Sequence, residues 1–189
     1  KDLNATPDHF VSIPTGIDLQ RYNVNRASPK KQARKSLGLP TNATVIGIAA
    51  TLRTWKGHDY LLQAFDQLSG QYPTCHLLIV GDGPMRPHIE QQIAKLPCSD
   101  RIHMTGHSRE VENALAAMDI FALPSYANEG VPQAILQAMA MSLPVVSTGV
   151  GAIEEALVDQ ETGITVLPKN AALLASALRL LLDDPDKAS

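Results

Sequence analysis

Short apolar runs alternate with longer amphipathic stretches from about residue 44 to the end of the chain. The apolar runs are rich in β-branched and aliphatic residues, which is typical of strands buried on both faces of a parallel sheet. They predict strands at residues 44–50, 76–80, 101–105, 120–123, 144–148 and 163–166. The amphipathic stretches predict helices at residues 58–68, 85–95, 109–117, 131–141 and 171–182.

This alternation predicts an α/β fold, a Rossmann-like domain of three layers with a parallel sheet, right-handed crossovers and helices on both faces. The first 40 residues differ: they contain an apolar run at 10–13, a turn at 14–18 and a basic helix near 30–37. We interpret residues 1–189 as a single domain. Residues 1–40 form its lead-in segment and first helix, and residues 41–189 form the repeated strand-helix core.

Composition narrows the possible functions. With 189 residues, of which 44% are hydrophobic and 19% charged, the chain can bury a core without a disulfide or metal. Its net charge of −3 and lack of a basic run disfavour a nucleic-acid partner or a general anionic-membrane surface. The longest apolar stretches, such as 173–182, are far shorter than the ~20 residues of a membrane span, so no transmembrane segment is expected.

The two cysteines, Cys75 and Cys98, lie far apart and belong to no metal-binding pattern, so we interpret both as structural residues of a reducing cytoplasm. The chain starts at Lys1 without the pattern of a signal peptide, which predicts a cytoplasmic location. His103 and His107 are four positions apart, but Gly106 would break a helix between them, so a metal pair is not expected. The other histidines form no constellation in the sequence.

In an open α/β sheet, ligands bind at the carboxyl ends of the strands, so the loops there are the candidate site. One of them, Gly81-Asp82-Gly83-Pro84, begins like a dinucleotide fingerprint. However, Arg86 occupies the place of the third glycine, and the next strand does not end in an acidic residue. We therefore favour a tight turn, with Pro84 as the first helical residue, over an NAD site.

A second loop, Arg53-Thr54-Trp55-Lys56-Gly57, follows the first strong strand. Its two cations could converge on a diphosphate, although basic side chains in loops are often only solvated. A third loop, 149–155, could form an anion-binding nest, but that signal is weak on its own.

Glu129 and Gln137 lie eight positions apart around the start of the predicted helix at 131–141. At a rise of about 1.5 Å per residue this is roughly two turns, and Gln137 then shares a face with Gln133 and Met141. The two side chains could grip different parts of an extended ligand. Alternatively, Glu129 only complements the positive end of the helix.

Taken in order, these segments resemble the carboxyl-terminal, donor-binding domain of the family 4 (group 1) retaining glycosyltransferases of GT-B fold. The resemblance covers nearly the whole chain and is most specific over residues 129–140, followed by 144–148 and Gly151. It implies that Glu129 is the first glutamate of the family's pair, near the transferred sugar. Gln137 replaces the second glutamate, which usually holds the ribose.

The resemblance also implies which residues act. Lys56 and Arg53 would neutralise the leaving diphosphate, and Arg53 is a candidate substitute for a family arginine at the position of Thr51. Glu129 would orient the sugar. Further donor contacts are expected from the loop after the fourth strand, from the next helix, from the loop that borders the base and from the glycine turn: Asn128, Gly130, Val131, Pro132, Gln133 and Gln137; His107, Ser108 and Arg109; and Gly81, Asp82 and Gly83.

As a function, the resemblance implies sugar transfer from a nucleotide diphosphate sugar with retention, without a metal or other cofactor, in bacterial cell-envelope polysaccharide or lipopolysaccharide synthesis. The acceptor, a saccharide or a lipid-linked one, would sit on an amino-terminal domain absent from this chain, so the fragment alone should be inactive in transfer. Any contact with the inner membrane would come from that missing domain. The alternatives are a non-catalytic nucleotide-sugar-binding domain, or a nucleotide-sugar epimerase or phosphorylase of the same fold.

Overall fold

The computed structural model describes residues 16–25 and 27–184, so the predicted apolar run at 10–13 lies outside the described part. The sheet is built from β1 (Thr44–Ala49), β2 (Cys75–Val80), β3 (Ile102–Gly106), β4 (Ile120–Leu123), β5 (Val145–Thr148) and β6 (Ile164–Val166). The α-helices are α1 (Lys30–Ser36), α2 (His58–Ser69), α3 (Arg86–Ile93), α4 (Val111–Ala117), α5 (Gln133–Ala140) and α6 (Ala171–Asp183). Three short 3₁₀ turns complete the described elements: η2 (Thr54–Lys56), η3 (Ser99–Arg101) and η4 (Ile153–Glu155).

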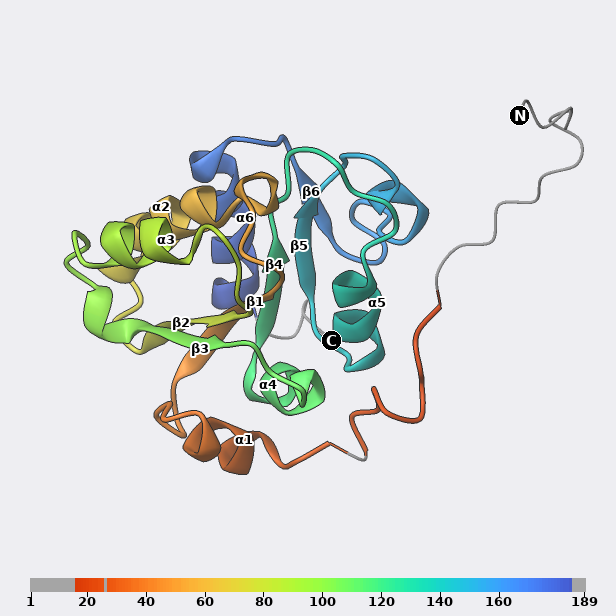
Figure 1. The fold of residues 1–189 in the computed structure, drawn as a ribbon, viewed down its shortest axis with the longest axis horizontal. Helices are drawn as coiled ribbons and strands as arrows, with labels where there is room; N and C mark the ends of the chain where they lie inside the picture. The colour runs from red at the N-terminus through yellow and green to blue at the C-terminus, as the bar shows by residue number, and fades with distance from the viewer. Residues whose placement is uncertain (1–15, 26, 185–189) are drawn as a thin grey trace, which may run out of the picture.

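The predicted Rossmann-like architecture is confirmed. The strands form a single six-stranded sheet in the order β3-β2-β1-β4-β5-β6, and each neighbouring pair is parallel. Helices α2, α3 and α6 pack together on one face, while α4, with α1 beside it, and α5 cover the other (Figure 1). The strand order reverses between β1 and β4, and at such a reversal the loops diverge and leave room for a ligand.

Three of the helices start later than the sequence pattern predicted: α3 by one residue, and α4 and α5 by two residues each. Helix α5 begins at Gln133, because Pro132 disfavours the helical conformation at Val131 and itself has an extended ψ of 119°. Helix α3 begins at Arg86, so Pro84 is not its first residue as predicted. Strand ends differ from the prediction by one residue at most.

The lead-in segment is attached to the sheet by charge. Arg34 of α1 is buried; its Nε donates to the Ala117 carbonyl at 3.0 Å and its guanidinium pairs with Asp119. Lys30 lies 2.7 Å from the other oxygen of Asp119. The Asp119 carboxylate also accepts the Val45 N–H at 2.7 Å, so it joins α1 to the amino ends of β1 and β4.

Backbone contacts then join the loops at the carboxyl edge of the sheet. The Gly81 N–H donates to the Gly106 carbonyl at 2.9 Å, and the Leu52 N–H donates to the Asp82 carbonyl at 3.0 Å. Gly81 has a φ of 138°, and a Cβ on it would lie 2.0 Å from the Ala50 carbonyl oxygen. Only glycine allows the β1 and β2 loops to approach this closely.

We expect Gly81→Ala to lower the free energy of unfolding by about 2 kcal/mol or more, because alanine disfavours this φ and its Cβ would overlap the neighbouring backbone. The matched control is Gly70→Ala, since Gly70 has a φ of −72° and no atom lies within 4 Å of an added Cβ. Urea titration of both variants is the measurement. An equal loss in the two would contradict the close-approach argument.

Candidate functional site

Three loops meet where the sheet order reverses. The Tyr126 N–H, after β4, donates to the Trp55 carbonyl, after β1, at 2.8 Å. Gly57 has a φ of 77° and packs so closely on the Pro124 carbonyl that a Cβ would lie 2.0 Å from its oxygen. The loop after β5 joins them through Gly151, where an added Cβ would lie 2.0 Å from the Glu129 carbonyl oxygen.

Lys56 and Glu129, predicted independently as site residues, are brought together by these loops. The Lys56 Nζ lies 2.7 Å from Oε1 and 3.0 Å from Oε2 of Glu129. Their side chains are 19% and 5% exposed, so the ion pair is largely shielded from water. Glu129 is therefore bound to a cation of another loop, rather than facing only the start of a helix as the alternative interpretation held.

Ser125 and Thr148 also hold Glu129, and the sequence analysis missed both. The Ser125 hydroxyl donates to Glu129 Oε1 at 2.6 Å, and the Thr148 hydroxyl donates to the Ser125 carbonyl at 2.5 Å. Both residues are buried at the carboxyl ends of apolar strands. Sequence reasoning could have found them as hydroxyl residues at the ends of buried strands, because buried polar groups need hydrogen-bond partners.

Arg53 is the second predicted cation of this loop, and it is exposed. Its guanidinium carbon lies 5.6 Å from the centre of the Trp55 ring. Within the described part of the chain no carboxylate pairs with it. Arg53 can therefore swing toward an anionic ligand with less competition than Lys56.

The segment from Asn128 to the start of α5 departs from the expected geometry. Asn128 has a φ of 57°, which non-glycine residues adopt rarely and which clusters at functional sites. Glu129 precedes α5 by four residues, so the predicted two-turn spacing between it and Gln137 along one helix is wrong. Gly130, Val131 and Pro132 lie before the helix, and the positive end starts only at Gln133. The physical reason is again Pro132, which has no N–H and holds Val131 extended.

Gln137 lies half-buried in the second turn of α5, while Gln133 is exposed in its first turn. No side chain among the described residues hydrogen-bonds the Gln137 amide. Its donor and acceptor are thus available to a ligand at this edge.

The turn of Gly81, Asp82 and Gly83 is tight, as predicted. The Gly83 N–H donates to Asp82 Oδ1 at 2.7 Å, and the Gly81 N–H is taken by the Gly106 carbonyl. Neither N–H is free for a pyrophosphate. The exposed Asp82 carboxylate leans toward Arg86, 3.3 Å away.

His107, Ser108 and Arg109 follow β3, the edge strand that β2 separates from β1. The Ser108 hydroxyl accepts the Glu110 N–H at 3.1 Å, and the Arg109 carbonyl accepts a hydrogen bond from Arg21 of the lead-in segment. The loop is thus held by the lead-in segment, which lies outside the sheet. The structure does not bring its side chains into contact with the pair.

His58 begins α2, directly after the Lys56 loop, and is 3% exposed. Among the described residues, neither ring nitrogen has a hydrogen-bond partner. Burial lowers the pKa of the imidazole from 6.5 to about 4; the charge of Asp59 opposes this shift, and that of Lys56 adds to it. The buried ring is therefore neutral near pH 7.

The sequence analysis did not predict that two histidines of neighbouring strands meet. His76 Nδ1 lies 2.9 Å from His103 Nε2, because β2 and β3 pair in parallel. Burial lowers the pKa of both imidazoles, and the charge of His103 adds to the shift at His76. Among the described residues, no third His, Cys, Asp or Glu completes a metal site with them.

The cysteines are free and buried, in agreement with a structural role. Burial raises the pKa of the Cys75 thiol to about 12, so it stays protonated and unreactive at neutral pH.

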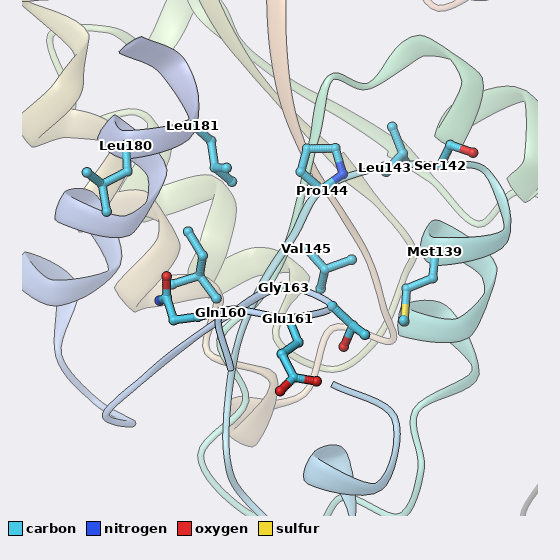
Figure 2. Close-up of a pocket in the computed structure, with 12 residues that line it drawn as sticks. Met139, Ser142, Leu143, Pro144, Val145, Gln160, Glu161, Gly163, Leu180 and Leu181 are labelled. Atoms are coloured by element: carbon cyan, nitrogen blue, oxygen red, sulfur yellow. The ribbon is translucent and has the colours of Figure 1, made fainter. Parts of the chain in front are cut away.

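A cavity of about 640 Å³ lies at the opposite, amino edge of the sheet (Figure 2). Its walls come from the end of α5, the start of β5 and the end of α6, and include Met139, Pro144 and Leu181. Glu161 is the one charged residue among the described residues that line it, and no cation does. This cavity therefore lacks the charge that a diphosphate requires.

Within residues 16–25 and 27–184, no helix has both the length and the apolar character that crossing a bilayer would require.

The fold is that of the carboxyl-terminal domain of GT-B glycosyltransferases. Residues 43–184 match the family model of glycosyl transferases group 1, so the chain belongs to this family. It is 31% identical over 189 residues to a D-inositol 3-phosphate glycosyltransferase of Corynebacterium aurimucosum, covering 96% of this chain and 45% of the relative. The chain thus spans about half the length of the curated relatives it matches.

Two solved structures are similar to this chain in fold and sequence. Anabaena Alr3699/HepE in complex with UDP and glucose has a TM-score of 0.82 at 27% identity, over 92% of this chain and 47% of that chain. The C-terminal domain of LpcC from Francisella tularensis, a group 1 glycosyl transferase family protein, has a TM-score of 0.80 at 26% identity. That match covers 91% of this chain and 90% of the solved domain.

The buried His58 predicts a specific pH dependence of stability. The unfolded chain takes up a proton near pH 6.5 but the folded chain only near pH 4, so stability falls as the pH drops between these values. We expect this group to remove about 3 kcal/mol over that range, with no further loss below it.

Denaturant titration at several pH values, on wild type and His58→Leu, is the measurement. The variant should lose less stability than wild type between pH 6.5 and 4. His107→Leu, at an exposed histidine, controls for the number of histidines. Parallel curves for wild type and His58→Leu would refute the buried-neutral assignment.

Proposed function

We propose that this chain is the donor-binding half of a retaining glycosyltransferase, which moves a sugar from a nucleotide diphosphate sugar to an acceptor. The observation that supports it most is the meeting of Lys56 and Glu129 at the carboxyl edge of the sheet, where Rossmann-like domains bind their ligands. The related Anabaena structure, which holds UDP and glucose, adds support.

Lys56 and Arg53 are proposed to neutralise the diphosphate as it leaves. Negative charge grows on the diphosphate while its bond to the sugar breaks, so cations placed there stabilise the transition state more than the ground state. These two side chains supply the charge without a resident metal or other cofactor. The N–H groups at the start of α5, from Gln133 onward, would add to the same positive field.

Glu129 is proposed to orient the sugar through its hydroxyls and to stabilise positive charge that develops at the anomeric carbon. Gln137 would hold the ribose as a neutral amide, which both donates and accepts hydrogen bonds. The loop of residues 107–109 would border the base.

The acceptor is proposed to bind an amino-terminal domain outside this chain, since the chain spans about half of its relatives. Without that domain, donor and acceptor are not held together, and transfer should be slow even where the donor binds. The proposed setting is bacterial envelope saccharide synthesis, on saccharide or lipid-linked acceptors. Two unpaired buried cysteines support a reducing cytoplasm.

Lys56→Ala should weaken nucleoside diphosphate binding at least about tenfold, because a charge-assisted contact to phosphate contributes ~1.5–3 kcal/mol. Backbone NMR titration with UDP, GDP, ADP and NAD is the measurement, and it also identifies the base. Lys31→Ala, at an exposed lysine of α1, is the control for net charge.

Since Lys56→Ala leaves Glu129 unpaired, Lys56→Arg is the companion variant, and it should keep the fold and part of the affinity. Unchanged binding in a folded Lys56→Ala protein would disprove the phosphate-site assignment. A full-length protein carrying the same change should also lose transfer.

Gln137→Ala should reduce the preference for a ribose nucleotide over its 2′-deoxy analogue by about five- to tenfold, the effect of roughly one hydrogen bond. Calorimetry with UDP and 2′-deoxy-UDP, or the corresponding pair for the base identified, measures this preference. Gln91→Ala, at an exposed glutamine of α3, should leave it unchanged. If Gln137→Ala lowers both affinities equally, the ribose contact is wrong.

A further inference from the structure

The ion pair between Lys56 and Glu129 affects which ligands the site can bind. The ammonium of Lys56 gives hydrogen bonds to both carboxylate oxygens of Glu129, at 2.7 and 3.0 Å. An ammonium has three N–H groups, so one donor remains for a phosphate while both bonds to Glu129 are kept. Its charge is also offset by a carboxylate whose side chain is only 5% exposed.

A bare nucleoside diphosphate therefore meets an unfavourable site. It must share Lys56 with Glu129, and its terminal phosphate brings negative charge toward the Glu129 carboxylate. Like charges repel more strongly in a partly buried site than in water, because less water screens them. Arg53, exposed against Trp55, is the cation left to compensate.

A nucleotide sugar meets a different site. Its sugar carries hydroxyl groups that can donate to the Glu129 carboxylate, which accepts from Lys56 and Ser125 and has about four acceptor positions. Donation from a sugar hydroxyl draws negative charge away from Lys56 and leaves that cation freer for the diphosphate. The sugar is also bonded to the terminal phosphate, which in a free diphosphate would face Glu129.

We propose that the Lys56–Glu129 pair makes this site discriminate between a nucleotide sugar and a free nucleoside diphosphate, and so promotes release of the diphosphate after transfer. The inference rests on the proposed function. It assigns to Glu129 a second role, in which its charge opposes the binding of the product.

The test is Glu129→Gln, which keeps the size of the side chain and an oxygen for Ser125 but removes the charge. Affinities for UDP and UDP-glucose, and for GDP and GDP-mannose, are measured by calorimetry on wild type and variant. We expect the variant to bind the free diphosphate about three- to tenfold more tightly. Its affinity for the nucleotide sugar should rise less or fall, so that the preference for the sugar form shrinks.

Two further variants separate charge from geometry. Glu161→Gln, at the amino-edge cavity, makes the same change in net charge far from the site and should leave both affinities unchanged. Ser125→Ala removes a neutral donor to Glu129 but keeps the charge of the carboxylate, so it should reduce the preference for the nucleotide sugar less than Glu129→Gln does. Thermal melts establish that each variant is folded.

The outcomes separate a failure of the discrimination proposal from a failure of the proposed donor-binding function. If the free diphosphate binds folded Glu129→Gln no better than wild type, the discrimination proposal is overturned while donor binding stands. If neither the nucleotides nor the nucleotide sugars bind wild type or Glu129→Gln, the proposed function of this chain is overturned. If Ser125→Ala collapses the preference as fully as Glu129→Gln, geometry rather than charge sets it, and the proposal is again wrong.

Discussion

The parallel direction of all six strands is the constraint from which the site arises. Because each strand ends at the same edge, the loops after β1, β4 and β5 must share a small space there. They fit by close backbone contact: Gly57 lies against Pro124, and Gly151 lies against Glu129. These contacts fix the backbone that carries Lys56 and Glu129, so their meeting is a property of the sheet and not of either loop alone.

Burial then determines how the two charges behave. A carboxylate that is 5% exposed cannot keep its water shell, so it needs a cation and hydrogen-bond donors from the protein. Lys56 supplies the cation and Ser125 a hydroxyl, itself anchored by Thr148. Arg53 sits outside this arrangement, exposed against Trp55. The two cations of one loop therefore have different tasks: one is committed to Glu129, and the other is available.

Membership of the glycosyl transferases group 1 family gives these side chains a chemical context. The resemblance implies a carboxylate at the position of Gln137 and a cation at the position of Thr51, so it predicts a site with fewer charges than the family pattern. In such a site the Lys56–Glu129 pair would have more weight in deciding what binds, since its charges are shielded from water.

The sequence by itself determined the order of elements and the parallel Rossmann-like class, and it predicted the carboxyl edge as the site and Lys56 and Glu129 as candidates there, because hydrophobic period and loop chemistry are local properties. Helix starts were less secure: Pro132 shifts the start of α5, and that shift invalidates the predicted spacing from Glu129 to Gln137. The Lys56–Glu129 bond, the support from Ser125 and Thr148, the burial of His58 and the His76–His103 contact were decided by tertiary structure alone. Each joins strands or loops that are distant in sequence, or depends on burial, and no local pattern encodes which distant groups will share a low-dielectric space.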